Sequence, residues 1–233
     1  MKKILFLLFL AGAAHLSAQT IVQQFAAVSA GAGQVSDMDL VQPTEKGSVL
    51  IAMPQLLSPD VKVLNVTDNA PDGGNSYKQV KSASASCSSK PIEIWYCENC
   101  NPGVTELKFH LSGHVRGSIN TFLEISGMAL SSVLDGNGVH VTDASAAKDG
   151  LEAGPRITTT ATDFIIARFS SSILPTGVTP TTWMYKPTYV YALNQPPGTH
   201  QFTLTGATSG STFCVSMAAF KTGAPVSVSK ENP

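Results

Sequence analysis

Short runs of alternating apolar and polar residues recur along the chain, separated by glycine, proline, asparagine and aspartate. In one run, Leu107, Phe109 and Leu111 alternate with polar residues, which is the period of two typical of a strand with one buried face. Helical periodicity is nearly absent. The pattern predicts about thirteen short strands. They cover residues 20–28, 47–53, 61–67, 76–83, 92–98, 104–112, 120–126, 138–142, 156–160, 163–170, 188–193, 199–205 and 211–220.

Many short strands without intervening long helices favour antiparallel pairing, and sheets of this size usually fold into two packed layers. We therefore predict an all-β fold, an antiparallel two-layer β-sandwich of jelly-roll type. No linker-like segment divides the 233-residue chain, so we expect a single sandwich domain over residues 19–221 and a flexible C-terminal tail at 222–233. The chain lacks a repeat of the length that propellers and solenoids show.

The first residues have the pattern of a signal peptide. Lys2 and Lys3 precede an apolar run at 4–10, and the small residue Ala18 stands at the expected cleavage point. We predict a signal peptide at 1–18 and a protein that is secreted or periplasmic. The apolar run is too short to span a bilayer, and we expect no integral membrane span.

Charge excludes two classes of partner. The chain has 15 Lys and Arg against 16 Asp and Glu, and the positive residues are scattered. Nucleic acid and anionic lipid require clustered basic residues, so neither is an expected partner. Charged residues make up 13% of the chain, below the ~25% of average soluble domains. The surface is therefore expected to be mainly uncharged and polar.

A succession of short motifs resembles a known type of domain. These motifs are VTDN at 66–69, NSY at 75–77, IWY at 94–96, NPG at 101–103, EISG at 124–127, LD at 134–135 and AAF at 218–220. Together they resemble an Ig-like or jelly-roll surface module of exported bacterial proteins, over roughly residues 45–221. The resemblance implies a two-layer β fold, and it implies no activity. This chain departs from the module at Cys97, where a small residue is usual, and in an expanded turn at 71–74.

The four cysteines predict disulfide bonds. Cys87, Cys97, Cys100 and Cys214 all follow the predicted signal peptide, and an even number of cysteines in an oxidising compartment favours bridges. Chain reversal near the turn at 101–103 would bring Cys97 and Cys100 close enough to pair, which leaves Cys87 to pair with Cys214. The alternatives are a redox pair, which needs the start of a helix, and a zinc site, which needs a second close pair of cysteines.

The carboxylates and histidines show no catalytic signature. Strand glutamates could serve a glycosidase only if two of them faced each other across a cleft, and Glu124 is the one best placed to point into a sheet face. A turn rich in Asp and Asn offers oxygen ligands to Ca²⁺, but tight turns need the same residue types. We predict no catalytic residue, metal or cofactor. The residues considered are Glu93, Glu98, Glu106, Glu124, His110, His114, Asp68, Asn69, Asp72 and Asn75.

Four aromatic residues are the candidate ligand-binding site. Trp183, Tyr185, Tyr189 and Tyr191 lie within nine residues, and in extended segments they share faces in pairs. Aromatic platforms bind the flat faces of sugars, although the same residues equally fill cores. The predicted function is therefore non-catalytic binding or surface interaction, with a polysaccharide or a surface protein as partner. The alternatives are a jelly-roll polysaccharide hydrolase or lyase, and a structural subunit of an envelope or extracellular assembly that pairs through exposed edge strands. The sequence does not indicate an oligomeric state.

Overall fold

The computed structural model describes residues 19–29, 33–80, 92–142, 151–171, 174–206 and 213–223. The predicted signal peptide, Cys87 and nearly all of the predicted tail lie outside these residues, and the extent of the single domain stays a prediction. Within the described ranges, no helix has the length and apolar character needed to cross a membrane.

The described residues form eighteen strands, and each ladder between them is antiparallel. The strands are β1 (Thr20–Ser29), β2 (Val35–Asp39), β3 (Val49–Leu56), β4 (Val63–Asp68), β5 (Lys78–Gln79), β6 (Trp95–Cys97), β7 (Glu106–Leu111), β8 (Ser118–Ser126), β9 (Leu134–Thr142), β10 (Leu151–Ala153), β11 (Ile157–Thr159), β12 (Asp163–Ser171), β13 (Gly177–Thr179), β14 (Met184–Lys186), β15 (Tyr189–Gln195), β16 (Gly198–His200), β17 (Thr203–Thr205) and β18 (Phe213–Lys221).

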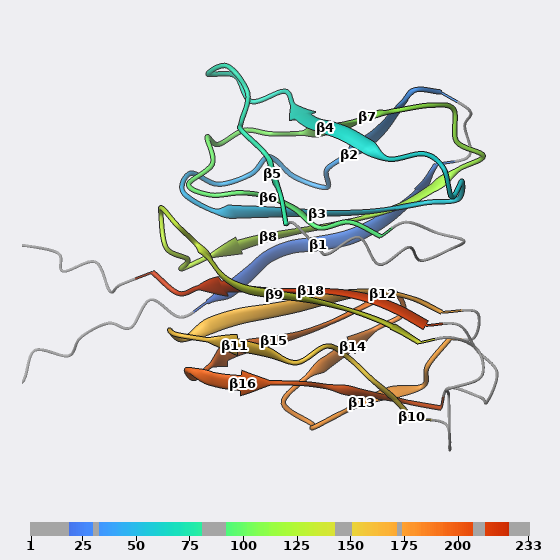
Figure 1. Cartoon of the computed structure of the whole chain (residues 1–233). Helices are drawn as coiled ribbons and strands as arrows, with labels where there is room; N and C mark the ends of the chain where they lie inside the picture. The colour runs from blue at the N-terminus through green and yellow to red at the C-terminus, as the bar shows by residue number, and fades with distance from the viewer. Residues whose placement is uncertain are drawn as a thin grey trace, which may run out of the picture.

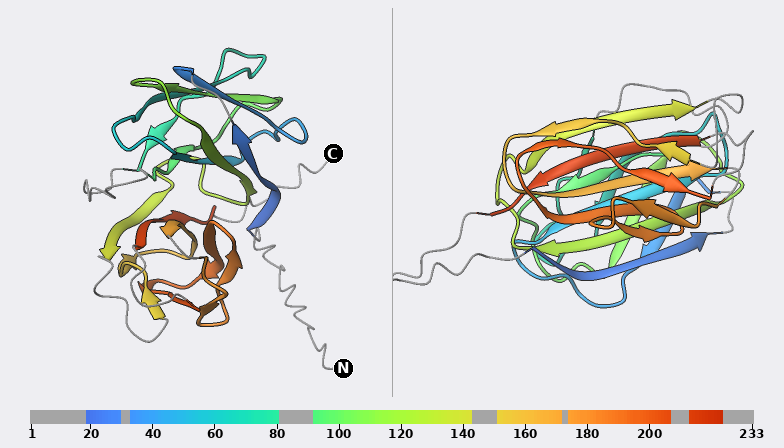
Figure 2. Two further views of the ribbon diagram at one scale, coloured as in Figure 1. Left: turned by 90° about the vertical axis from the view of Figure 1, so that its right-hand side faces the viewer. Right: turned by 90° about the horizontal axis from the view of Figure 1, so that it is seen from below.

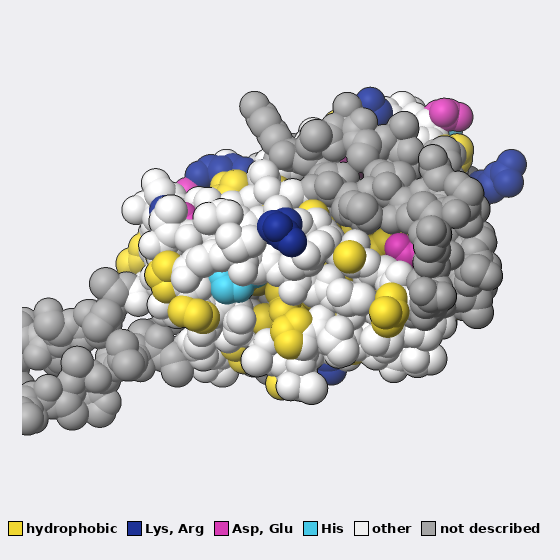
Figure 3. All heavy atoms as spheres, turned by 60° about the horizontal axis from the view of Figure 1, so that its bottom comes forward, with side chains coloured by type: hydrophobic (Ala, Val, Ile, Leu, Met, Phe, Trp, Pro, Cys, Tyr) yellow, Lys and Arg dark blue, Asp and Glu magenta, His cyan; other side chains and the backbone are white. Residues whose placement is uncertain are grey.

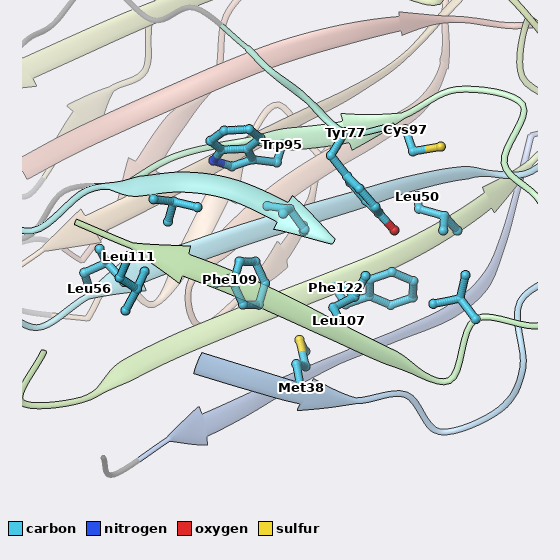
Figure 4. Packing of buried hydrophobic residues seen from close by; sticks show 14 of the residues in the cluster. Met38, Leu50, Leu56, Tyr77, Trp95, Cys97, Leu107, Phe109, Leu111 and Phe122 are labelled. Carbon is cyan, nitrogen blue, oxygen red and sulfur yellow. The ribbon is translucent and has the colours of Figure 1, made fainter. Parts of the chain in front are cut away.

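The N-terminal half of the chain forms two sheets that face each other. Central sheet I has the strand order β1-β8-β3-β6-β5, and outer sheet I has the order β2-β7-β4. Leu107, Phe109 and Leu111 on alternate positions of β7 are buried between them, as the sequence pattern predicts. Figure 4 shows Phe109 from β7 and Phe122 from β8 in this core.

The C-terminal half repeats this arrangement. Central sheet II has the strand order β14-β15-β12-β18-β9. Two small outer sheets, β10-β17-β13 and β11-β16, cover one of its faces. The core between these layers contains Phe169, Trp183, Phe202 and Phe213.

The two central sheets pack against each other in the middle of the molecule (Figure 1). Their shared core joins Ile51 of β3 and Leu123 of β8 to Phe164 of β12 and Phe220 of β18. The antiparallel all-β sandwich is thus confirmed, and the outer sheets cover it on both sides. Because central strands have neighbours on both faces, β3 is buried at all its positions and shows no apolar–polar alternation.

Candidate functional site

The first strand, β1, forms one edge of central sheet I. It is ten residues long and pairs with β8 from Thr20↔Ser126 to Ser29↔Ser118. No other strand of the described chain pairs with β1. Figure 2 shows it along the side of the molecule, at the margin of the sheet. The long edge strand is therefore positioned to add another strand to the sheet.

The composition of β1 sets it apart from the other long edge strands. Its sequence TIVQQFAAVS contains no charged residue, glycine or proline. Natural sheets usually protect their edges with charges, proline or very short strands. The other long edge strands carry charges. β2 contains Asp37 and Asp39, β4 contains Asp68, and β9 contains Asp135 and two glycines. The ladder of β1 has an irregularity between Ile21 and Gln23, but the regular stretch from Gln23 to Ser29 contains no charge or proline, which distinguishes it from these other edges.

Exposed valines lie close to β1 in the sequence. Val28 of β1, Val35 at the start of β2 and Val41 are 76%, 44% and 77% exposed. The Gln23 side chain donates a hydrogen bond to the carbonyl of Gln42 at 3.0 Å, which places the segment around Val41 next to β1. The face formed by the C-terminal outer sheets, shown in Figure 3, is instead mainly uncharged and polar, with separated apolar side chains. We name β1 together with Val35 and Val41 the β1 edge.

Glu124 anchors the β1 edge to the rest of the sheet. Its carboxylate is fully buried and accepts hydrogen bonds from Gln23 Nε2 at 2.7 Å and from the backbone N–H of Glu45 at 2.6 Å. The sequence indicates that Glu124 can point into a sheet face, and its side chain does lie in the interior. Its contacts show a structural role, because both carboxylate oxygens accept hydrogen bonds from the protein itself.

The four aromatic residues of the predicted sugar platform do not gather on the surface. Trp183 is 4% exposed and packs on Phe202 at a ring-centroid distance of 5.1 Å. Tyr189 and Tyr191 stack at 6.2 Å in the core between the central sheets, where they are 5% and 8% exposed. Tyr185 is half-buried and donates a hydrogen bond to the carbonyl of Pro175. The β14–β15 hairpin thus divides the rings between two different cores.

The other glutamates of the predicted strands have separate structural partners. Burial raises the pKa of Glu93, although its carboxylate accepts hydrogen bonds from Trp95 Nε1 at 2.7 Å and Gln79 Nε2 at 2.9 Å. Glu98 forms an ion pair with Lys78 and also accepts the backbone N–H of Val133. Burial by itself raises the pKa of Glu98, but the hydrogen bonds from Lys78 and Val133 and the charge of Lys78 act together with a further backbone donor to lower the pKa. Further contacts of this kind join Glu106 to Lys108 and His110 to Thr67.

The disulfide between Cys97 and Cys100 is confirmed. Their Cα atoms are 6.0 Å apart, within the usual range for a bridge, and the two residues are 3% and 1% exposed. A buried bridge at the end of a strand suits a structural role better than thiol exchange, which needs access to the sulfur atoms. Cys87 lies outside the described residues, so its bridge to Cys214 stays a prediction.

The acidic turn after β4 is held together by Asp68. Its carboxylate accepts the backbone N–H groups of Ala70 and Asn75 at 3.1 Å each, Asn75 Nδ2 at 2.7 Å and the Tyr77 hydroxyl at 2.9 Å. A calcium ion would have to displace these donors. Among the residues that the structure describes, no group of three or more His, Cys, Asp or Glu side chains could hold a metal ion.

Arg168 is a buried cation between the two central sheets. It is fully buried in β12 and donates to the carbonyl of Thr188 and to Gln55 Oε1, both at 2.9 Å. Burial lowers the pKa of its guanidinium group to about 10. In the sequence, Arg168 is the one charge in the apolar run 164–169, and this is the signal that could have identified it. The uncharged stretch 20–29 is the corresponding signal for the β1 edge.

Comparison with known proteins gives no relative for this arrangement. Neither a protein-family model, nor a curated protein, nor a solved structure matches the chain.

Proposed function

We propose that the protein is an exported, non-catalytic interaction module that associates with a second copy of itself through the β1 edge. The observation that carries the proposal is the ten-residue, uncharged edge strand, which pairs with β8 on one side. Pairing of two such edges would join two five-stranded sheets into one continuous sheet. The predicted signal peptide and the Cys97–Cys100 disulfide support an oxidising location outside the cytoplasm.

Self-pairing is favoured by the residues of β1. In a two-fold antiparallel pair centred on Ala26, Phe25 would face Ala27 of the second copy, and Gln24 would face Val28. Since β1 carries no charge, this symmetric pairing brings no like charges together along the strand. The low formal net charge of −1 also keeps repulsion between whole chains small.

The sugar-binding and enzymatic alternatives have less support. Three of the four predicted platform rings are buried, and a sugar needs rings that it can reach. The glutamates that an enzyme could use accept hydrogen bonds from neighbouring strands or loops. The role of assembly subunit, in contrast, requires an accessible edge strand without charges, and the stretch of β1 from Gln23 to Ser29 has these properties.

Two lysines in β1 should prevent association. Ala26 and Val28 are exposed, so the double change Ala26→Lys and Val28→Lys leaves the described core intact. We expect the dimer of the wild-type protein to dissociate at least ~10-fold more readily in this variant, because like charges and lysine desolvation oppose strand pairing. Analytical ultracentrifugation over a range of concentrations measures the change.

A matched control carries the same charges on β10. Leu151 and Ala153 are exposed at the same spacing, and Leu151→Lys with Ala153→Lys should dimerise like wild type. A wild-type protein that remains monomeric at all concentrations would overturn the proposal. Equal dissociation constants for wild type and the β1 variant would show that the copies meet at another surface.

A further inference from the structure

A second unusual feature is the carboxyl group of Asp163, the first residue of β12 in central sheet II. The carboxyl group of Asp163 is fully buried, and neither of its oxygens has a hydrogen-bond partner. A buried carboxylate without donors is costly, whereas a neutral carboxylic acid in the same place is much less so. The environment of Asp163 therefore favours the protonated form.

The neighbouring carboxylate, Asp135 of β9, has the opposite environment. It accepts hydrogen bonds from the backbone N–H and the hydroxyl of Thr160, and from the N–H of Ala161 at 3.1 Å. Lys221 Nζ lies 3.4 Å from Asp135 Oδ1. Burial by itself would raise the pKa of Asp135, but these donors outweigh it and lower the pKa to about 2. Asp135 is thus a permanent negative charge that holds the turn between β11 and β12.

The charged and polar groups that influence Asp163 do not offset its burial. Asp135 of β9 repels a second negative charge, and Lys221 of β18 already contacts Asp135. The hydroxyl of Thr159 of β11 lowers the pKa of Asp163, but its effect is smaller than those of burial and of Asp135. Gln195 of β15 is opposite Asp163 in the sheet. Burial first, and then the charge of Asp135, raise the pKa of Asp163 to about 7.

We propose that Asp163 acts as a latch that is controlled by protonation. Its neutral carboxyl keeps the junction of β9, β11, β12 and β18 closed, and loss of its proton loosens that junction. Ionisation places a second negative charge beside Asp135 inside the fold. The turn at 160–162 is the part that can relieve this repulsion by opening, because Asp135 holds it through hydrogen bonds. The latch is independent of the β1 edge and goes beyond the proposed function.

The direction of the pH effect follows from proton binding. Between about pH 4 and pH 7 the folded protein keeps the Asp163 proton, which the unfolded chain has released. Folding is therefore favoured by acid in this range, and the unfolding equilibrium constant should rise by up to about tenfold per pH unit from this group. Asp135 acts in the opposite sense, since its contribution is lost as the pH falls from about 4 to about 2.

The test compares Asp163→Asn with wild type by urea unfolding from pH 4 to pH 8. Asparagine resembles the protonated acid in shape and does not ionise. We expect similar unfolding constants at pH 4, and at pH 8 an unfolding constant at least ~10-fold smaller for Asp163→Asn than for wild type. Asp72→Asn, at an exposed aspartate, is the matched control and should follow the wild-type profile.

Two readings on the wild-type protein make the test independent of how the variant folds. NMR titration should show the Asp163 carboxyl ionising near neutral pH, and hydrogen exchange at Thr160 and Ala161 should lose protection over the same range. Ionisation of Asp163 near its ordinary pKa of about 4 would overturn the proposal. The same conclusion would follow if the pH profiles of wild type and Asp163→Asn were parallel, because His200 or another group would then cause the pH dependence.

Discussion

Replacing Arg168 with alanine should lower the free energy of unfolding by about 3 to 5 kcal/mol. The side chain is fully buried, so its removal leaves a hole between the two central sheets. The change also removes the donors that reach Thr188, Gln55 and the carbonyl of Ile119. Gln55 Oε1 then loses its donor inside the fold, which adds to the cost of the hole, while the carbonyl of Thr188 keeps the N–H of Phe169. Urea unfolding measures the loss.

Two further variants identify the cause of this loss. Arg168→Met fills most of the hole and removes a buried charge, so it should stay within about 1.5 kcal/mol of wild type. Arg116 is exposed, and Arg116→Ala should change stability by less than about 0.5 kcal/mol. If Arg168→Ala cost no more than Arg116→Ala, Arg168 would not be the link between the sheets that we describe.

Replacing Asp68 with alanine should cost about 2 to 4 kcal/mol, the second largest effect that we expect. The carboxylate accepts four hydrogen bonds within the turn after β4, including one from the buried Tyr77 hydroxyl. Alanine leaves all four donors without this acceptor. Thermal or urea unfolding of the variant measures the effect.

The exposed Asp72 lies in the same turn, and Asp72→Ala should be within about 0.5 kcal/mol of wild type. Because the Asp68 carboxylate is used by protein donors, adding Ca²⁺ or a chelator should leave the unfolding midpoint of the wild-type protein unchanged. A midpoint that rises with Ca²⁺ would contradict this account of the turn and would favour a cation site.

Local patterns in the sequence predict much of the fold. The alternation of Leu107, Phe109 and Leu111 identifies β7 and its buried face. Short strands such as β14 escape prediction because three residues contain too little pattern to recognise. The packing of the two central sheets also escapes prediction, since a strand covered on both faces, such as β3, gives an apolar run that does not reveal what covers it.

The site is harder to predict than the fold because burial decides it. Tyr189 and Tyr191 look like a platform in the sequence, but β15 lies inside a sheet and turns both rings into the core. Cys97 and Cys100 were predictable because a nearby turn limits their separation. The strand at β1 could be predicted as well, but its position at an edge depends on long-range pairing with β8.

The most direct test of the β1 edge is hydrogen exchange of the β1 amides, measured by NMR at low and at high protein concentration. Pairing between copies protects the amides that point away from β8, and these alternate along the strand. We predict that the exchange of alternate amides between Gln23 and Ser29 slows only at high concentration. Exchange in β1 that is the same at both concentrations would contradict association through this edge.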